Sequence, residues 1–110
     1  MLLYEELSGK VRGAAIEVHR ELGPGLLENA YEEWLCHELN AMRVPYQRQL
    51  ALPVNYKGLT LPCGYRVDLL VDDKIILELK CVDVLLPVHD AQLMTYLKIS
   101  KCKLGLFDQL

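Results

Sequence analysis

The 110-residue sequence predicts a mixed α/β fold in the order ααβββαβ, with a mixed four-stranded sheet flanked by helices. Two observations carry this prediction. Apolar residues recur at helical spacing in the first 42 residues, whereas the middle of the chain has short apolar runs separated by turn residues. With 52% hydrophobic and 25% charged residues, the chain has the composition of one globular domain spanning residues 1–110.

Two helices are expected first. The helix over about residues 5–22 has an apolar face made of Leu7, Val11, Ala14, Ala15, Val18 and Leu22. The segment Gly23-Pro24-Gly25 ends it, because glycine and proline together disfavour helical backbone. The helix over about residues 26–42 has an apolar face made of Leu27, Tyr31, Trp34, Leu35, Leu39 and Met42.

Four strands and a third helix complete the fold. The strands are expected over residues 46–56, 65–71, 74–82 and 103–107. Turns are expected at Lys57-Gly58 and Asp72-Asp73, where glycine and aspartate favour a reversal of the chain. Pro87 precedes a helix over about residues 88–100.

Charge and hydropathy exclude several classes of protein. A protein that binds phosphates through charge alone is basic, so the net charge of −3 means that nucleic-acid binding requires a local patch or a bound cation. No apolar run approaches the roughly 20 residues of a membrane-spanning helix. The N-terminal MLLYEELSGK lacks the basic start and long apolar stretch of a secretory signal, so we expect a cytoplasmic protein without a membrane partner.

The four cysteines do not form a metal-binding pattern. Cys36, Cys63, Cys81 and Cys102 include no closely spaced pair of the kind that supplies two zinc ligands from one turn. We expect reduced, mostly buried thiols.

The segment VDLLVDDKIILELK, residues 67–80, places charged residues inside apolar runs. Glu78 and Lys80 are two apart on a strand, so both side chains leave the same face. The position of Asp68 depends on the turn. A two-residue loop pairs Asp68 with Leu77 and turns it to the opposite face, whereas a three-residue loop or a bulge pairs Asp68 with Glu78.

We expect the second register, because it separates charged from apolar side chains. One face then carries Arg66, Asp68, Glu78 and Lys80. The other face carries Val67, Leu69, Val71, Ile75, Leu77 and Leu79.

Two carboxylates this close repel each other by about 4 kcal/mol at 4 Å with an effective dielectric constant near 20. Such a pair takes up a proton or binds a cation, and hard oxygen ligands suit Mg²⁺ or Mn²⁺. The ammonium group of Lys80 can position a water molecule or neutralise developing negative charge. Together these groups suit hydrolysis of a phosphodiester. The alternative is a charged cross-strand cluster on a solvated sheet face.

Asp68 followed by Glu78-Leu79-Lys80 resembles the core motif of the PD-(D/E)XK nuclease superfamily. The third helix strengthens this resemblance, since Gln92 and Tyr96 form a QxxxY motif similar to that of RecB- and Cas4-like nucleases. Upstream, GLLENAY at residues 25–31 is a G-x-x-E-x-x-Y motif and resembles the GxxExxY proteins, a compact family of this type.

The resemblance covers roughly residues 8–106 and implies a PD-(D/E)XK, restriction-endonuclease-like core. It implies a metal-dependent nuclease that hydrolyses phosphodiester bonds in DNA and uses Mg²⁺ or Mn²⁺. The implied metal ligands are Asp68, Glu78 and Glu28. The implied catalytic lysine is Lys80, and Gln92 and Tyr96 would line the site or orient the substrate.

Alternatives remain open at several positions. Glu28 lies in the first turn of its helix, where an acid also interacts favourably with the helix dipole. Gly25 and Tyr31 are expected to act structurally, in the turn and in packing. Further candidates near the site are Glu17, His19 and Gln49.

The partners are also open at this stage. The basic residues Lys98, Lys101 and Lys103 could guide a nucleic-acid backbone or only complement a helix C-terminus. A catalytically weak or inactive nuclease-fold module that binds protein or nucleic acid is the rival function, and a homodimer is a further expectation. Proteins of the family usually continue past the last strand with an Asn-Phe-Gly-type segment, whereas this sequence ends at LGLFDQL, so we expect a short last strand.

Overall fold

A computed structural model describes residues 4–23, 27–61, 65–80, 85–100, 102 and 104–109. Its helices are α1 (Glu5–Leu22), α2 (Glu28–Ala41) and α3 (Pro87–Ser100). Its strands are β1 (Tyr46–Ala51), β2 (Val54–Tyr56), β3 (Leu59–Leu61), β4 (Arg66–Val71), β5 (Ile75–Lys80) and β6 (Leu104–Gln109). The expected mixed α/β class is confirmed.

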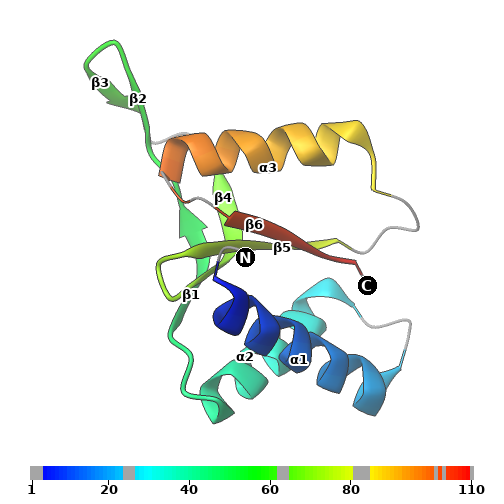
Figure 1. The fold of residues 1–110 in the computed structure, drawn as a ribbon. Coiled ribbons are helices and arrows are strands. Elements are labelled where there is room, and N and C mark those ends of the chain that lie inside the picture. The colour runs from blue at the N-terminus through cyan, green and yellow to red at the C-terminus, as the bar shows by residue number, and fades with distance from the viewer. Residues whose placement is uncertain are drawn as a thin grey trace.

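The main sheet has four strands in the order β1-β4-β5-β6. The β1–β4 and β4–β5 pairs are antiparallel and the β5–β6 pair is parallel, so the sheet is mixed, as expected. Helices α1 and α2 lie on one face of this sheet and α3 lies on the other (Figure 1).

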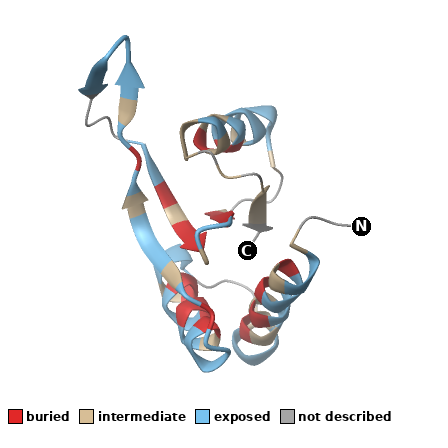
Figure 2. Ribbon diagram, turned by 60° about the vertical axis from the view of Figure 1, so that its left-hand side comes forward, coloured by how far each residue is buried: buried red, intermediate tan, exposed pale blue. Residues whose placement is uncertain are grey.

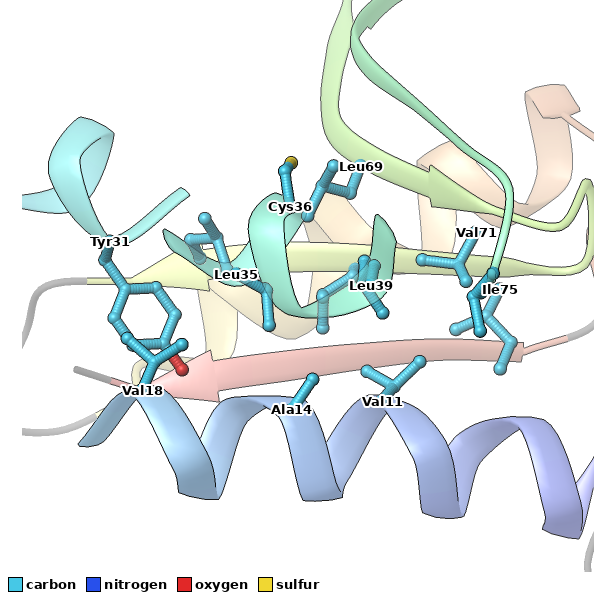
Figure 3. Close-up of a cluster of buried hydrophobic side chains, with 13 residues drawn as sticks. Val11, Ala14, Val18, Tyr31, Leu35, Cys36, Leu39, Leu69, Val71 and Ile75 are labelled. Atoms are coloured by element: carbon cyan, nitrogen blue, oxygen red, sulfur yellow. The ribbon is translucent and has the colours of Figure 1, made fainter. Parts of the chain in front are cut away.

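The larger core lies between the sheet and the pair α1–α2. Figure 3 shows Val11, Ala14 and Val18 of α1 directed toward α2 and the sheet. The sheet and α2 contribute Tyr31, Leu35, Cys36, Leu39, Leu69, Val71, Ile75, Leu77 and Leu79. This apolar surface removed from water is the main favourable term in folding, at about 25 cal/mol per Å².

A smaller core lies between the sheet and α3. It contains Leu52, Val67, Leu70, Ile76, Leu93 and Tyr96. The expectation that Val67 packs with Leu69 and Val71 was wrong, because Val67 belongs to this second cluster. The other five apolar residues expected on that hairpin face do pack together in the larger core.

The expected strand over residues 46–56 is two strands. Leu52 is buried and Pro53 interrupts the strand, after which β2 pairs with β3 through the turn at Lys57-Gly58. Both turn residues have left-handed backbone, with φ of 49° and 83°, as a tight two-residue hairpin requires. The β2–β3 hairpin projects away from the sheet and is largely exposed (Figures 1 and 2).

The apolar face expected for the second helix was partly wrong. Trp34 is 50% exposed and Leu27 is 73% exposed, whereas Tyr31, Leu35 and Leu39 are fully buried. The buried face also includes Cys36 and the carboxylate-bearing Glu32. Burial follows the stripe that contacts the sheet, and Trp34 lies beside that stripe.

Several further expectations can be compared with the structure. Helix α1 has the expected bounds, and β6 is as long as β5, so the last strand is not short.

Within the described residues, no helix has the length and apolar character needed to cross a bilayer. Cys36 is buried and Cys102 is half-buried, both as free thiols, whereas Cys63 and Cys81 lie outside the described residues.

The packing of α3 on the sheet leads to a stability prediction. A Cβ atom added to Gly105 would lie 2.8 Å from Cδ1 and 2.9 Å from Cγ of Leu93. Because Leu93 is buried, Gly105→Ala is expected to lower the free energy of unfolding by about 1–3 kcal/mol. Gly9→Ala is the matched control, since nothing lies within 4 Å of that position in α1, and it should raise stability by about 0.5–1 kcal/mol. Urea denaturation of the two variants measures both effects, and equal stabilities would contradict the close approach of Leu93.

Candidate functional site

The register of the β4–β5 hairpin agrees with the sequence prediction. Val71 pairs with Ile75, Leu70 with Ile76 and Leu69 with Leu77, so three residues form the turn. Continued by one step, this register places Asp68 opposite Glu78. The two carboxylates therefore share a face of the hairpin.

The two carboxylates replace backbone pairing where the β4–β5 ladder ends. The backbone N–H of Leu79 donates a hydrogen bond of 2.8 Å to Oδ2 of Asp68. The backbone N–H of Asp68 donates one of 3.3 Å to Oε1 of Glu78. Each acid thus binds the opposite strand, which fixes both side chains next to each other.

Glu78 is a buried carboxyl group next to a second acid. Its side chain is buried, with 3% of the residue exposed. Burial, together with the neighbouring charge of Asp68, raises the pKa of Glu78 to about 8, although the positive charge of Lys80 acts in the opposite direction. At neutral pH and without a metal ion, Glu78 is therefore mostly protonated.

Lys80 and two tyrosines surround the carboxylates. Lys80 is half-buried on β5, two residues beyond Glu78 and on the same face of the strand. Tyr96 of α3 is buried, and burial, together with the charges of Glu78 and Asp68, raises the pKa of its hydroxyl group. The ring of Tyr65 meets that of Tyr96 edge-on, with centroids 6.1 Å apart. The site therefore lies on the α3 side of the sheet with an aromatic wall.

A second group of charges approaches the site from α2. Glu32 is 5% exposed and accepts a hydrogen bond of 2.8 Å from the guanidinium of Arg48. Arg48 also pairs with the exposed Glu33 at 2.8 Å, and these two acids raise the pKa of the guanidinium above its ordinary value. The positive charge compensates the burial of the Glu32 carboxylate.

Gln49 connects this ion pair to the two-acid site. Its amide nitrogen Nε2 lies 2.7 Å from Oε1 of Glu32 and 3.4 Å from Oδ1 of Asp68. Both oxygens of the Asp68 carboxylate thus accept hydrogen bonds, one from Gln49 and one from the Leu79 backbone.

A comparison with protein families shows which superfamily the chain belongs to. A family model described as the PD-(D/E)XK nuclease superfamily matches residues 5–107. The chain belongs to that superfamily. The resemblance seen in the motifs is confirmed at this level, whereas the narrower GxxExxY resemblance stays a prediction. A search of curated proteins and a search of solved structures each found no match.

PD-(D/E)XK nucleases generally use divalent metal ions. The carboxylate oxygens of Asp68 and Glu78 are the hard donors that such ions prefer. Mg²⁺ is commonly bound by one or two carboxylates, with water and substrate phosphate as its other ligands. The raised pKa of Glu78, caused by burial and by the charge of Asp68, means that a second negative charge is disfavoured at this place unless a cation compensates it. In the parts of the chain that the structure describes, no group of three or more His, Cys, Asp or Glu side chains could bind a metal ion. A metal ion bound at Asp68 and Glu78 would therefore have two protein carboxylates as ligands.

Two other predicted PD-(D/E)XK site residues lie on helices. Glu28 is the first residue of α2 and is exposed. Gln92 is exposed on α3, one turn before Tyr96. Because no third acid completes a metal-binding group in the described residues, the role of Glu28 as a ligand stays a prediction.

The remaining candidates have structural partners or cannot be placed. Glu17 pairs with Arg20 at 3.2 Å, and the ring of His19 lies 5.0 Å from that of Tyr31. Tyr31 is fully buried, which confirms its packing role. Gly25, Lys101 and Lys103 lie outside the described residues. Lys98 is exposed in the last turn of α3.

Sequence reasoning missed Glu32 and Arg48. A signal for Glu32 was present, because it precedes Leu35, Cys36 and Leu39 by three, four and seven residues and so falls on the buried stripe of its helix. A carboxylate on such a stripe requires a partner. Nothing local in the sequence identifies Arg48 as that partner.

Proposed function

We propose that this protein is a metal-dependent nuclease that hydrolyses phosphodiester bonds, with DNA as its substrate. The single observation that supports this proposal best is the pair of Asp68 and Glu78, whose side chains are fixed together beside Lys80 in a PD-(D/E)XK chain. Two neighbouring carboxylates repel each other when both are ionised, and a bound cation relieves that repulsion in competition with a proton.

Asp68 and Glu78 would bind the metal ion, Mg²⁺ or Mn²⁺. When bound, the ion would polarise a phosphate oxygen and lower the pKa of a bound water molecule. Lys80 supplies a positive charge next to the acids, where it neutralises negative charge that develops on the phosphate oxygens. The hydroxyl group of Tyr96 can donate a hydrogen bond at the same place, and Gln92, one turn away, can contact the substrate.

The charge of the chain explains why this site would need its cation. At a net charge of −3, the protein as a whole does not attract a phosphate backbone. A divalent ion and Lys80 together reverse the sign of the local field at the two carboxylates. Substrate binding is therefore expected to depend on the metal.

The direct test is cleavage of labelled single-stranded and double-stranded DNA, and of RNA, with Mg²⁺ or Mn²⁺. Cleavage should require the metal and should be lost in Asp68→Asn, which retains the shape of the side chain but removes its charge. Cleavage by Asp68→Asn at the wild-type rate would reject the proposed active site. Asp73→Asn, in the exposed hairpin turn, is the matched control and should cleave normally.

A nuclease-fold module that binds without cleaving is the second candidate. The observation in its favour is that the described residues contain no group of three or more His, Cys, Asp or Glu side chains that could bind a metal ion. Retained binding of DNA, without cleavage under any metal, would favour this function. In that case Asp68→Asn should leave DNA binding unchanged.

A further inference from the structure

The β1–β4 ladder is interrupted opposite the candidate site. Residues Tyr46, Gln47 and Arg48 pair with β4, and so do Leu50 and Ala51, but the pair of Gln49 and Asp68 that this register implies is missing. Gln49 has a left-handed backbone with φ of 49°, in the middle of a strand. A side chain with Cβ disfavours this conformation, so surrounding contacts must stabilise it.

The contacts that compensate this strain are those of the side-chain amide. The left-handed backbone turns Gln49 so that Nε2 reaches Glu32 at 2.7 Å and Asp68 at 3.4 Å. Glu32 is in turn fixed by Arg48, whose Nε and guanidinium nitrogen lie 3.2 and 2.8 Å from Oε2. A continuous chain of hydrogen bonds thus runs from buried α2 to one oxygen of Asp68.

We infer that Gln49 is a positioning residue, which orients the Asp68 carboxylate for metal binding by anchoring it to the buried Glu32, which in turn pairs with Arg48. The backbone N–H of Leu79 donates a hydrogen bond to Oδ2 of Asp68 and Gln49 donates one to Oδ1, so both contacts favour the orientation of the carboxylate beside Glu78. Residues that orient metal ligands through hydrogen bonds typically change metal affinity 10- to 100-fold when replaced. This inference rests on the proposed metal site and adds a residue that would not touch the metal or the substrate.

The test compares two replacements of Gln49 in the absence of nucleic acid. Gln49→Asn keeps an amide that is too short to reach both acids, and asparagine tolerates left-handed backbone better. Gln49→Leu keeps the strain and removes the donor. We expect both variants to bind Mn²⁺ at least about 10-fold more weakly in titrations followed by Mn²⁺ electron paramagnetic resonance. The melting temperature in EDTA should be unchanged or raised for Gln49→Asn and lowered for Gln49→Leu.

A role in folding alone cannot produce this combination, because the melting temperatures move differently while Mn²⁺ affinity falls in both variants. Lys57→Asn is the matched control, since Lys57 has the same φ of 49° in the exposed hairpin turn. It should leave Mn²⁺ affinity unchanged.

Two distinct results would overturn the role of Gln49 or the metal site. Mn²⁺ affinity of both Gln49 variants within twofold of wild type overturns the positioning role and leaves the proposed nuclease site intact. Mn²⁺ binding by wild type that Asp68→Asn does not weaken overturns the metal site itself, and the role of Gln49 with it.

Discussion

Replacing Lys80 with methionine is expected to lower the rate of metal-dependent DNA cleavage about 100- to 1,000-fold. The reason is that Lys80 supplies the positive charge beside Asp68 and Glu78, whereas methionine keeps much of the stem and loses only the charge. A positive charge that is already positioned beside the developing negative charge stabilises the transition state more than the same charge does in water. Single-turnover cleavage at saturating Mn²⁺ measures the chemical step.

Lys74 provides the matched control for Lys80. It lies in the turn of the same hairpin and its ammonium pairs with the Asp72 carboxylate at 3.1 Å. Lys74→Met removes the same charge from the chain but not from the site, so cleavage should remain at the wild-type rate. Equal losses in the two variants would mean that net charge, rather than a catalytic lysine, governs the activity.

Glu78→Gln is expected to abolish a large pH dependence of stability. Below pH 4.5, the ordinary pKa of the group, the carboxyl is protonated in both the folded and the unfolded chain. Between this value and about 8, the unfolded chain ionises while the folded chain keeps its proton. Unfolding then releases a proton, so raising the pH favours the unfolded state.

The free energy of unfolding of wild type in EDTA should therefore fall by about 2–4 kcal/mol more than that of Glu78→Gln as the pH rises from 4.5 to above 8. Urea denaturation at several pH values measures the difference. The exposed Glu33 is the control, because the hydrogen bond from Arg48 lowers its pKa, and Glu33→Gln should not remove the decline. Parallel profiles for wild type and Glu78→Gln would contradict the buried, crowded position of this carboxyl.

Mn²⁺ should cancel much of this pH-dependent fall in the free energy of unfolding. A cation that binds the ionised pair replaces the proton and stabilises the folded state by mass action. The stabilising effect of Mn²⁺ should therefore grow as the pH rises toward 8. This growth should be absent in Glu78→Gln.

The local sequence predicted the fold well where periodicity and turn chemistry act within one element. The bounds of α1 and the turn at Lys57-Gly58 follow from apolar spacing and from glycine. The hairpin register followed from the separation of charged and apolar residues, because a shift by one residue would exchange the two faces of both strands.

The sequence-based predictions were wrong where an element packs against another element that is distant in the chain. The exposure of Trp34 depends on which stripe of α2 contacts the sheet, and periodicity alone gives neighbouring stripes similar weight. Val67 packs in the cluster that contains Leu52 and residues of α3, and not in the cluster that contains α2. Which cluster it joins depends on how the strands and helices are arranged in the folded protein. The β2–β3 hairpin was missed because its strands are short, with three residues each.

The sequence by itself determined the superfamily, the order of the main elements and the three charged residues of the β4–β5 hairpin. The tertiary structure alone decided that Asp68 is bound through Gln49 to an ion pair between α2 and β1, and that Tyr65 and Tyr96 form a wall beside the acids. The physical reason is that motifs and periodicity act over a few residues. Hydrogen bonds between Glu32 and residues 16 or 17 positions away exist only after the sheet and helices have packed.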